Sequence, residues 1–192
     1  MNEHAFDQPP DDRGNSDRHR SPYSTKEKIG RVLWGVCAVT LFRFSPRPCW
    51  GFRIWLLRLF GGEVHGSARI HPTVRIFIPW NLSISANVAI GDRAILYALG
   101  PIAIGQRSTV SQHAHLCAGT HDFNDAQMPL VRPPISIGAD VWIAADAFVG
   151  PGCSIGDGVI LGARGVTMKD LSDWTIYAGN PARKIKDRDR LG

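Results

Sequence analysis

Hydrophobic residues recur every six positions through the middle of the chain, a period that fits neither an α-helix nor an isolated amphipathic strand. In residues 137–168 an aliphatic residue opens each hexad except the last, and Gly or Ala follows it in the first five. A fixed hexad is typical of a parallel β-helix, whose short strands stack coil on coil. The hexads open at Val64, Ile70, Ile76, Ile84, Ile90, Leu96, Ile104, Val110, Leu116, Ile137, Ile143, Val149, Ile155, Leu161 and Thr167.

The repeat slips after every third hexad. Two extra residues follow the hexads of Ile76 and Leu96, and fifteen follow that of Leu116. A coil with three flat faces produces such slips when additions accumulate at one corner. We therefore expect a mainly β protein, a parallel β-helix of about five three-hexad coils over residues 63–168, with a loop at residues 120–134 that projects from that corner. A long insertion in an otherwise tight solenoid is typical of a functional loop.

The residues before the repeat fall into two parts. Residues 1–28 are rich in Asp, Arg, Pro and Ser and are expected to be disordered. Residues 29–62 are apolar and predict two helices, separated near Ser45-Pro46. Two interpretations of this segment remain open: it caps the exposed end of the β-helix, or residues 29–60 contact a membrane surface as in-plane helices.

Composition narrows the class of partner and the compartment. The net charge is +5, with basic residues mostly at the two ends of the chain, which favours an anionic ligand or surface over a nucleic-acid groove. The four cysteines show no paired spacing, and Cys153 occupies an inward position of the repeat. Together with a polar N-terminus that lacks a signal-peptide pattern, these features predict reduced thiols and a cytoplasmic protein, at the inner face of the membrane if the helices bind there.

Several segments, taken together, resemble one group of enzymes. They are residues 41–46 (LFRFSP), 56–61 (LLRLFG), 96–100 (LYALG), 116–122 (LCAGTHD) and 179–182 (GNPA). With the hexads, they make residues 29–187 similar to the hexapeptide-repeat acetyltransferases, most closely to the colanic acid biosynthesis type. The resemblance implies a left-handed β-helix, a homotrimer with active sites between subunits, acetyl-CoA as co-substrate, and a sugar or glycolipid acceptor in extracellular polysaccharide biosynthesis.

The resemblance also implies roles for particular residues. His121 stands at the family's general base, while the family's catalytic-site Asn falls near Gly91 and is not retained. The C-terminal tail, residues 169–192, is expected to complete the acetyl-CoA site. The residues at the family's acetyl-CoA positions are Trp142 beside the channel, Ala145 and Ala163 along the pantetheine arm, and Lys169, Arg183 and Lys186 near the phosphates.

A neutral imidazole suits the transfer of an acyl group from a thioester to an alcohol, because it takes the hydroxyl proton as the oxygen attacks. Asp122 is the adjacent candidate for orienting His121 or contacting substrate, although a backbone carbonyl is the commoner orienting partner, and no metal is required. Two other classes stay open: a zinc hydratase of the γ-carbonic anhydrase kind, with His115 and His121 as two of three ligands, and a non-enzymatic solenoid scaffold.

Overall fold

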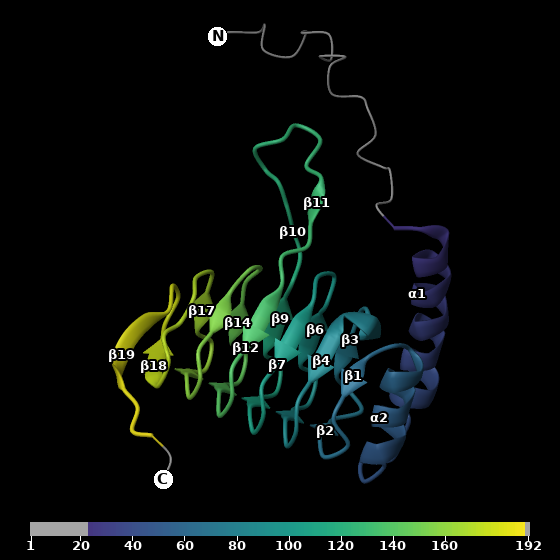
Figure 1. Ribbon diagram of the computed structural model, residues 1–192, viewed down its shortest axis with the longest axis horizontal. Helices are drawn as coiled ribbons and strands as arrows, with labels where there is room; N and C mark the ends of the chain where they lie inside the picture. Colours follow the sequence, from purple (N-terminus) through teal and green to yellow (C-terminus); the bar gives the residue numbers. More distant parts are fainter. Residues whose placement is uncertain (1–22, 191–192) are drawn as a thin grey trace, which may run out of the picture.

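The computed structural model describes residues 23–190, which form a solenoid of short parallel strands covered at one end by two helices (Figure 1). Three sheets make the three sides of a triangular, left-handed β-helix. Sheet A consists of β1 (Glu63–Val64), β4 (Leu82–Ile84), β7 (Ile102–Ile104), β12 (Ile135–Ile137) and β15 (Ser154–Ile155). Sheet B contains β2 (Arg69–Ile70), β5 (Ala89–Ile90), β8 (Thr109–Val110), β13 (Trp142–Ile143), β16 (Ile160–Leu161), β18 (Thr175–Ala178) and β19 (Arg183–Asp187). Sheet C consists of β3 (Arg75–Ile76), β6 (Ile95–Tyr97), β9 (His115–Cys117), β14 (Phe148–Val149) and β17 (Val166–Thr167).

The hexads of the sequence are the strands of the solenoid. Residues that open corresponding hexads are Cα partners in neighbouring coils, as Ile84 is of Ile104 and Leu96 of Leu116. The residues that open the fifteen hexads are buried and fill the interior. The prediction of a parallel β-helix with five coils of three hexads is confirmed. The long insertion leaves from the corner between sheets C and A, where the two-residue slips also fall.

The solenoid continues beyond residue 168, where the hexad pattern stops. Leu171 pairs in parallel with Ile155, and β18 pairs in parallel with β16, so the chain forms part of a sixth coil. Strand β19 then folds back antiparallel on β18. The hexad pattern did not predict this coil, because the inward positions Thr167 and Leu171 are four residues apart rather than six.

The helical segment begins earlier than expected. Ser24 and Glu27 form a capping box, in which the Ser24 hydroxyl accepts from Glu27 N and the Glu27 carboxylate accepts from Ser24 N. The expected disordered stretch therefore ends before Ser24, and its residues 1–22 lie outside the described part of the chain. The helical elements are α1 (Thr25–Cys37), a π-helical turn η2 (Ala38–Phe42), α2 (Trp50–Leu59) and a short 3₁₀ turn η3 (Pro79–Asn81).

The helices close the open end of the solenoid with hydrogen bonds as well as apolar contacts. Each strand of the first coil has a carbonyl that would accept from a preceding coil, and a helix side chain donates to it instead. Arg58 Nε donates to Val64 O in sheet A (2.8 Å), Arg53 Nε to Ile70 O in sheet B (2.7 Å), and Trp34 Nε1 to Ile76 O in sheet C (2.7 Å). The helices thus take the place of a coil.

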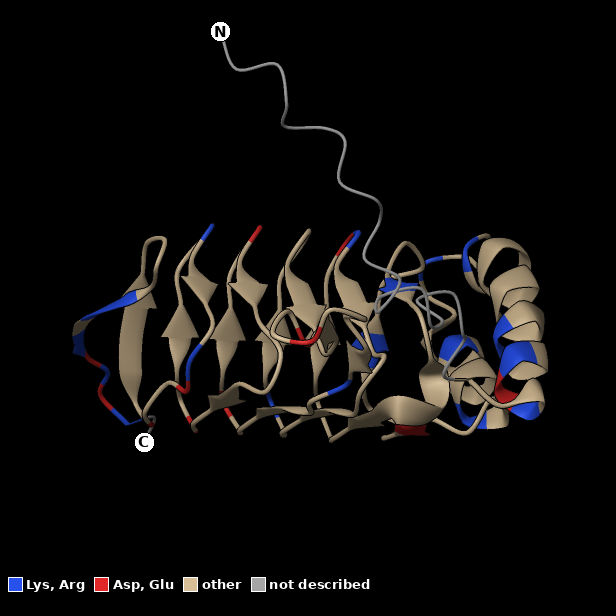
Figure 2. Cartoon of the chain, turned by 90° about the horizontal axis from the view of Figure 1, so that it is seen from above, with Lys and Arg blue, Asp and Glu red and all other residues tan. Residues whose placement is uncertain are grey.

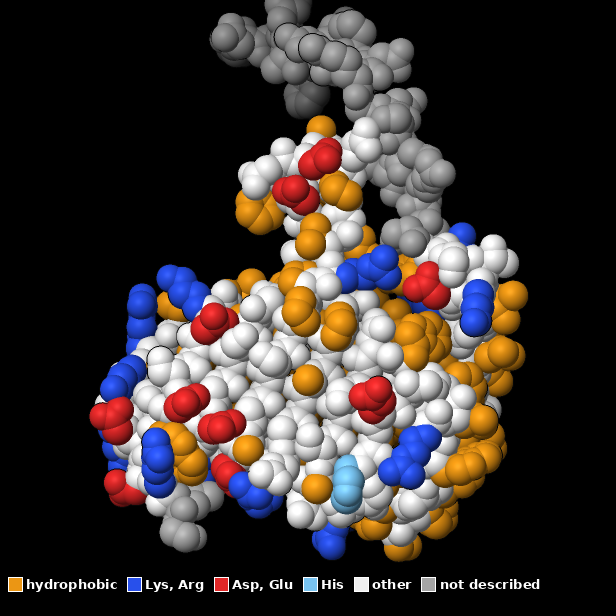
Figure 3. All heavy atoms as spheres, viewed as in Figure 1, with side chains coloured by type: hydrophobic (Ala, Val, Ile, Leu, Met, Phe, Trp, Pro, Cys, Tyr) orange, Lys and Arg blue, Asp and Glu red, His pale blue; other side chains and the backbone are white. Residues whose placement is uncertain are grey.

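The outer face of the helices remains apolar and exposed. Val32 is 67% exposed, Phe44 82% and Trp55 55%. In Figure 3 hydrophobic side chains gather along the edge of the molecule where α1 and α2 lie. Lys and Arg concentrate on the helices and on β19, at the two ends of the solenoid (Figure 2). Among residues 23–190, no helix has both the length and the apolar content that a bilayer crossing requires.

Candidate active site

The inserted loop is a β-hairpin that places His121 at its root. Strands β10 (Thr120–His121) and β11 (Leu130–Val131) pair antiparallel, with His121 opposite Leu130. The bond from Asp122 N to Pro129 O (3.0 Å) continues this pairing toward the tip. The hairpin stands away from the corner between sheets C and A (Figure 1), so the imidazole of His121 is exposed to solvent.

A backbone carbonyl fixes the His121 ring. Nδ1 of His121 lies 2.5 Å from the carbonyl oxygen of Met128, which can only accept a hydrogen bond. The neutral ring therefore carries its proton on Nδ1, and Nε2 keeps the lone pair. Met128 has a φ of 46°, a left-handed conformation that turns the hairpin back toward His121. The ring is held in the tautomer that a general base needs.

Asp122 does not orient His121 in this structure. Its Oδ1 accepts from the backbone N of Asn124 (3.0 Å), which forms an Asx turn at the start of the hairpin tip. The orienting role expected for this carboxylate is taken by the Met128 carbonyl. Neighbouring residues on a strand point to opposite faces, which explains why the Asp122 carboxylate turns away from the imidazole. Its contact with a substrate stays a prediction.

Three residues expected at the acetyl-CoA site lie together on another part of the solenoid. Trp142, on β13, is 47% exposed, and its indole N–H donates to the hydroxyl of Ser111 (2.9 Å). Ala145 and Ala163 occupy equivalent turns between sheets B and C in successive coils, joined by the bond from Arg164 N to Ala145 O (2.9 Å). Small residues at this corner leave room beside the exposed indole.

The basic residues of the C-terminal part divide between the last strand of sheet B and one corner of the prism. Arg183 and Lys186 are exposed on β19, at the far edge of sheet B. Strands β16 and β18 separate β19 from β13, so these cations stand about 14 Å from Trp142 at the usual strand spacing. Lys169 instead follows β17, at the corner between sheets C and A, where its backbone N donates to the Thr167 hydroxyl (3.2 Å).

One chain therefore carries two separate groups of candidate residues. His121, Asp122 and Lys169 lie at the corner between sheets C and A. The other group is spread over sheet B and its corner with sheet C, and consists of Trp142, Ala145, Ala163, Arg183 and Lys186. Because these are different corners of a triangular prism, a single chain does not bring His121 to the indole of Trp142.

His115 occupies a different environment from His121. It stands on sheet C between the rings of Tyr97 (6.3 Å between centroids) and Phe148 (5.2 Å), and its Nε2 is buried without a hydrogen-bond partner. Burial lowers the pKa of His115, and the nearby Arg75 lowers it further. Within residues 23–190, no three side chains of His, Cys, Asp or Glu lie close enough to share a metal ion.

Residue types could not identify two features of the site. The orienting group of His121 is a main-chain carbonyl seven residues away, whose position depends on the conformation of the hairpin. The hairpin root also contacts helix α1. The ring of Tyr23 lies under the guanidinium groups of Arg31 (4.1 Å) and Arg132 (5.2 Å), and Arg132 directly follows β11.

Comparison with known proteins places this geometry in a family. Residues 134–166 match the family model described as bacterial transferase hexapeptide (six repeats). The protein named colanic acid biosynthesis acetyltransferase WcaF in Escherichia coli (strain K12) is 40% identical over 156 residues, which cover 81% of this chain and 86% of that protein.

Solved structures agree on the fold. A maltose O-acetyltransferase from Clostridium difficile 630 superposes with a TM-score of 0.79 and 25% identity, over 87% of this chain and 90% of that one. A hexapeptide-repeat acetyltransferase from Vibrio cholerae, solved with acetyl coenzyme A, gives a TM-score of 0.78 at 23% identity over 90% and 94% of the two chains. From the repeat, the projecting hairpin and the extent of these matches, the chain belongs to the hexapeptide-repeat acetyltransferases, in the group of the colanic acid biosynthesis acetyltransferases.

Proposed function

We propose that this acetyltransferase moves an acetyl group from acetyl-CoA to a sugar hydroxyl, with His121 as the general base. The observation that carries the proposal is the bond between His121 Nδ1 and Met128 O, which leaves a lone pair on Nε2 in an exposed ring at the hairpin root. Trp142, Ala145 and Ala163 lie on the same side of the solenoid as the cations of β19, and this combination suits a pantetheine arm and its phosphates.

The reaction follows from these positions by direct attack. His121 Nε2 takes the proton of the acceptor hydroxyl while its oxygen attacks the thioester carbonyl carbon. The tetrahedral intermediate then collapses, the carbon–sulfur bond breaks, and the imidazolium returns the proton to the leaving thiolate. The products are the acetyl ester and free CoA. No acyl-enzyme is needed, because the thioester is already activated.

The separation of the two residue groups supports a homotrimer with sites between subunits. His121 and the Trp142 group occupy different corners of one prism. In a closed ring of three copies, one corner of each chain faces a different corner of the next. Such an arrangement would bring His121 of one copy toward the Trp142 edge of its neighbour and give three equivalent sites.

We also propose that the acceptor belongs to extracellular polysaccharide biosynthesis, and that the enzyme works at the cytoplasmic face of a membrane. The relative named for colanic acid biosynthesis supports the first part. The exposed Phe44 and Trp55 support the second, since aromatic side chains flanked by Lys and Arg suit an anionic lipid surface.

Replacement of His121 tests the chemical role. His121→Ala should lower transfer to an acceptor sugar by about 100- to 10,000-fold, the usual contribution of a general base, while the melting temperature, the trimer and acetyl-CoA binding persist. His65→Ala is the matched control, because His65 is an exposed histidine in the first coil. A His121→Ala enzyme with near-wild-type turnover would remove His121 from the reaction.

Sedimentation with vesicles tests the membrane contact. Wild-type protein should sediment with phosphatidylglycerol vesicles and not with phosphatidylcholine vesicles. Binding should fall in Trp55→Ser and Phe44→Ser. Phe123→Ser serves as control, since Phe123 is 80% exposed but lies at the hairpin tip. Equal sedimentation of all three variants, or none of the wild type, would contradict the proposal.

A further inference from the structure

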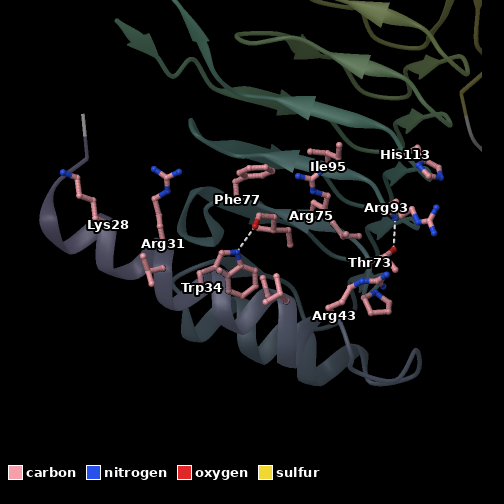
Figure 4. Close-up of a pocket in the computed structure, with 17 residues that line it drawn as sticks. Lys28, Arg31, Trp34, Arg43, Thr73, Arg75, Phe77, Arg93, Ile95 and His113 are labelled. Atoms are coloured by element: carbon pink, nitrogen blue, oxygen red, sulfur yellow. Dashed lines mark hydrogen bonds between the residues drawn. The ribbon is translucent and has the colours of Figure 1, made fainter. Parts of the chain in front are cut away.

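A cleft of about 1050 Å³ runs between the helical segment and the outer surface of sheet C in the first three coils. In Figure 4 helix α1 forms one wall, and the strands that carry Arg75, Phe77 and Ile95 form the opposite one. Trp34 lies at its base and donates its indole N–H to Ile76 O (2.7 Å), which fixes the distance between the two walls. The cleft is therefore a stable feature of the packing between helix and sheet.

The charged side chains that line this cleft are all basic. Lys28 and Arg31 stand toward one end of α1, Arg43 and Arg93 toward the opposite end, and Arg75 between them (Figure 4). Within residues 23–190, no Asp or Glu is among the lining residues. Five cations around an apolar base suit a ligand with an anionic group and an apolar part.

Carboxylates lie near two of the five cations, Arg93 and Arg31. Asp92 accepts a hydrogen bond from the Thr73 hydroxyl, and its carboxylate lies 3.3 Å from His71 Nδ1. Its distance to the guanidinium of Arg93 is longer, at 3.9 Å. The hydrogen bond from Thr73 is the main cause of the lowered pKa of Asp92. This carboxylate therefore stays ionised and interacts with Thr73 and His71. Glu27, on α1, lies near enough to Arg31 for the two charges to interact. Lys28, Arg43 and Arg75 form no ion pair with a carboxylate among residues 23–190.

The α1 end of the cleft is linked through Tyr23 to the hairpin that carries His121. At its α1 end, Arg31 shares the ring of Tyr23 with Arg132, which directly follows β11. Val131 of that strand pairs with Thr120, the residue before His121. The cation Arg31 of the cleft is thus connected to the root of the hairpin of the same chain.

We propose that this cleft binds the phosphate or diphosphate group of the acceptor, so that the acetylated sugar is one carried on a phosphate ester. The inference rests on the proposed function and names its substrate class. The cations hold the phosphate oxygens, and the apolar base contacts the carrier attached to them. A nucleoside diphosphate and a prenyl diphosphate share this chemistry, and binding measurements can distinguish them.

The test is calorimetric titration of the full-length protein after saturation with CoA, which occupies the CoA site and removes its phosphate contacts from the measurement. Inorganic diphosphate, UDP and geranyl diphosphate are the probes. The variants are Arg31→Gln, Arg43→Gln and Arg75→Gln. The control is Arg69→Gln, an exposed arginine on β2 in sheet B of the first coil.

At least one diphosphate should bind wild type and Arg69→Gln with the same dissociation constant. Each cleft variant should raise that constant about ten-fold or more, as expected when one charge-assisted hydrogen bond is lost. Tighter binding of UDP indicates a nucleotide carrier, and tighter binding of geranyl diphosphate a lipid carrier. Retained CoA binding and melting temperature show that a variant is folded.

Three results would overturn the inference. If CoA binds but no diphosphate does, or if the cleft variants bind as tightly as Arg69→Gln, the cleft is not the phosphate site and the acetyl-transfer proposal is unaffected. If CoA itself fails to bind, the proposed function fails and this inference fails with it.

Discussion

Arg53 is the side chain on which attachment of the helices depends most. It is fully buried, and its guanidinium donates to Ile70 O (2.7 Å), Ser45 Oγ (2.8 Å), Pro46 O (2.8 Å) and Arg47 O (2.7 Å). The first of these bonds completes the open edge of sheet B, and the others hold the connection between the two helices. Arg53→Met keeps much of the side-chain volume and removes the hydrogen-bond donors. We predict that this variant weakens the attachment of the helices to sheet B and the connection between the two helices, and so lowers the free energy of unfolding.

The size of the effect follows from these bonds. The loss of the donor leaves the buried Ile70 carbonyl unpaired, at a cost of about 1–3 kcal/mol. The carbonyls of Pro46 and Arg47 are less buried and regain water, so each adds less. Burial lowers the pKa of Arg53, which means that its charge is partly desolvated in the native state, and removing it returns some free energy. The net loss is about 3 kcal/mol, or roughly 6–12 °C in melting temperature for a chain of this size.

Thermal unfolding followed by circular dichroism at a fixed protein concentration measures this change. Arg58→Met is the matched comparison, because Arg58 is exposed and donates one bond, to Val64 O. Its loss should cost about 0.5–1.5 kcal/mol. If Arg53→Met melts within 2 °C of the wild type, or no lower than Arg58→Met, the interpretation of Arg53 as the main attachment of the helices is refuted.

Three further predictions concern single side chains. Trp142→Phe should change stability by about 0.5 kcal/mol or less, because the ring is 47% exposed, but should raise the KM for acetyl-CoA several-fold; an unchanged KM would remove Trp142 from that site. His115 has a lowered pKa from burial and Arg75, so the unfolded chain takes up a proton first and stability falls as pH drops through about 6.5; His115→Phe should flatten this loss in melting curves at pH 7.5 and 5.5, and an unchanged slope would contradict it. Gly105→Ala would place a Cβ 2.4 Å from the backbone carbon of Gly138 and should cost about 3 kcal/mol or more in urea unfolding; an unchanged midpoint would show that the coils can separate there.

The sequence was most informative where packing depends on local spacing. Each inward position of the solenoid repeats the environment of the one below it, so Ile84, Leu96 and Ile104 mark the strands directly. The pattern failed at Leu171, where the turn is shorter although the side chain still points inward. The helix start at Ser24 was also missed, although the Ser24 and Glu27 pair signals it.

The site was predictable in part. The position of His121 at the root of an insertion followed from the slip in the repeat and from family resemblance. Its orientation by the Met128 carbonyl did not, since a main-chain acceptor carries no residue signature. The basic cleft was hidden for another reason: Arg31, Arg75 and Arg93 are far apart in sequence and meet only when α1 packs on sheet C.

The most direct test of acetyl transfer is calorimetric titration of the purified protein with acetyl-CoA and with CoA, with metal analysis of the same sample. We predict saturable binding of both, one molecule per chain, in a sample without stoichiometric zinc. Stoichiometric zinc without CoA binding would contradict this assignment and favour the hydratase, and a protein that binds neither would leave a solenoid with no acetyl-transfer function.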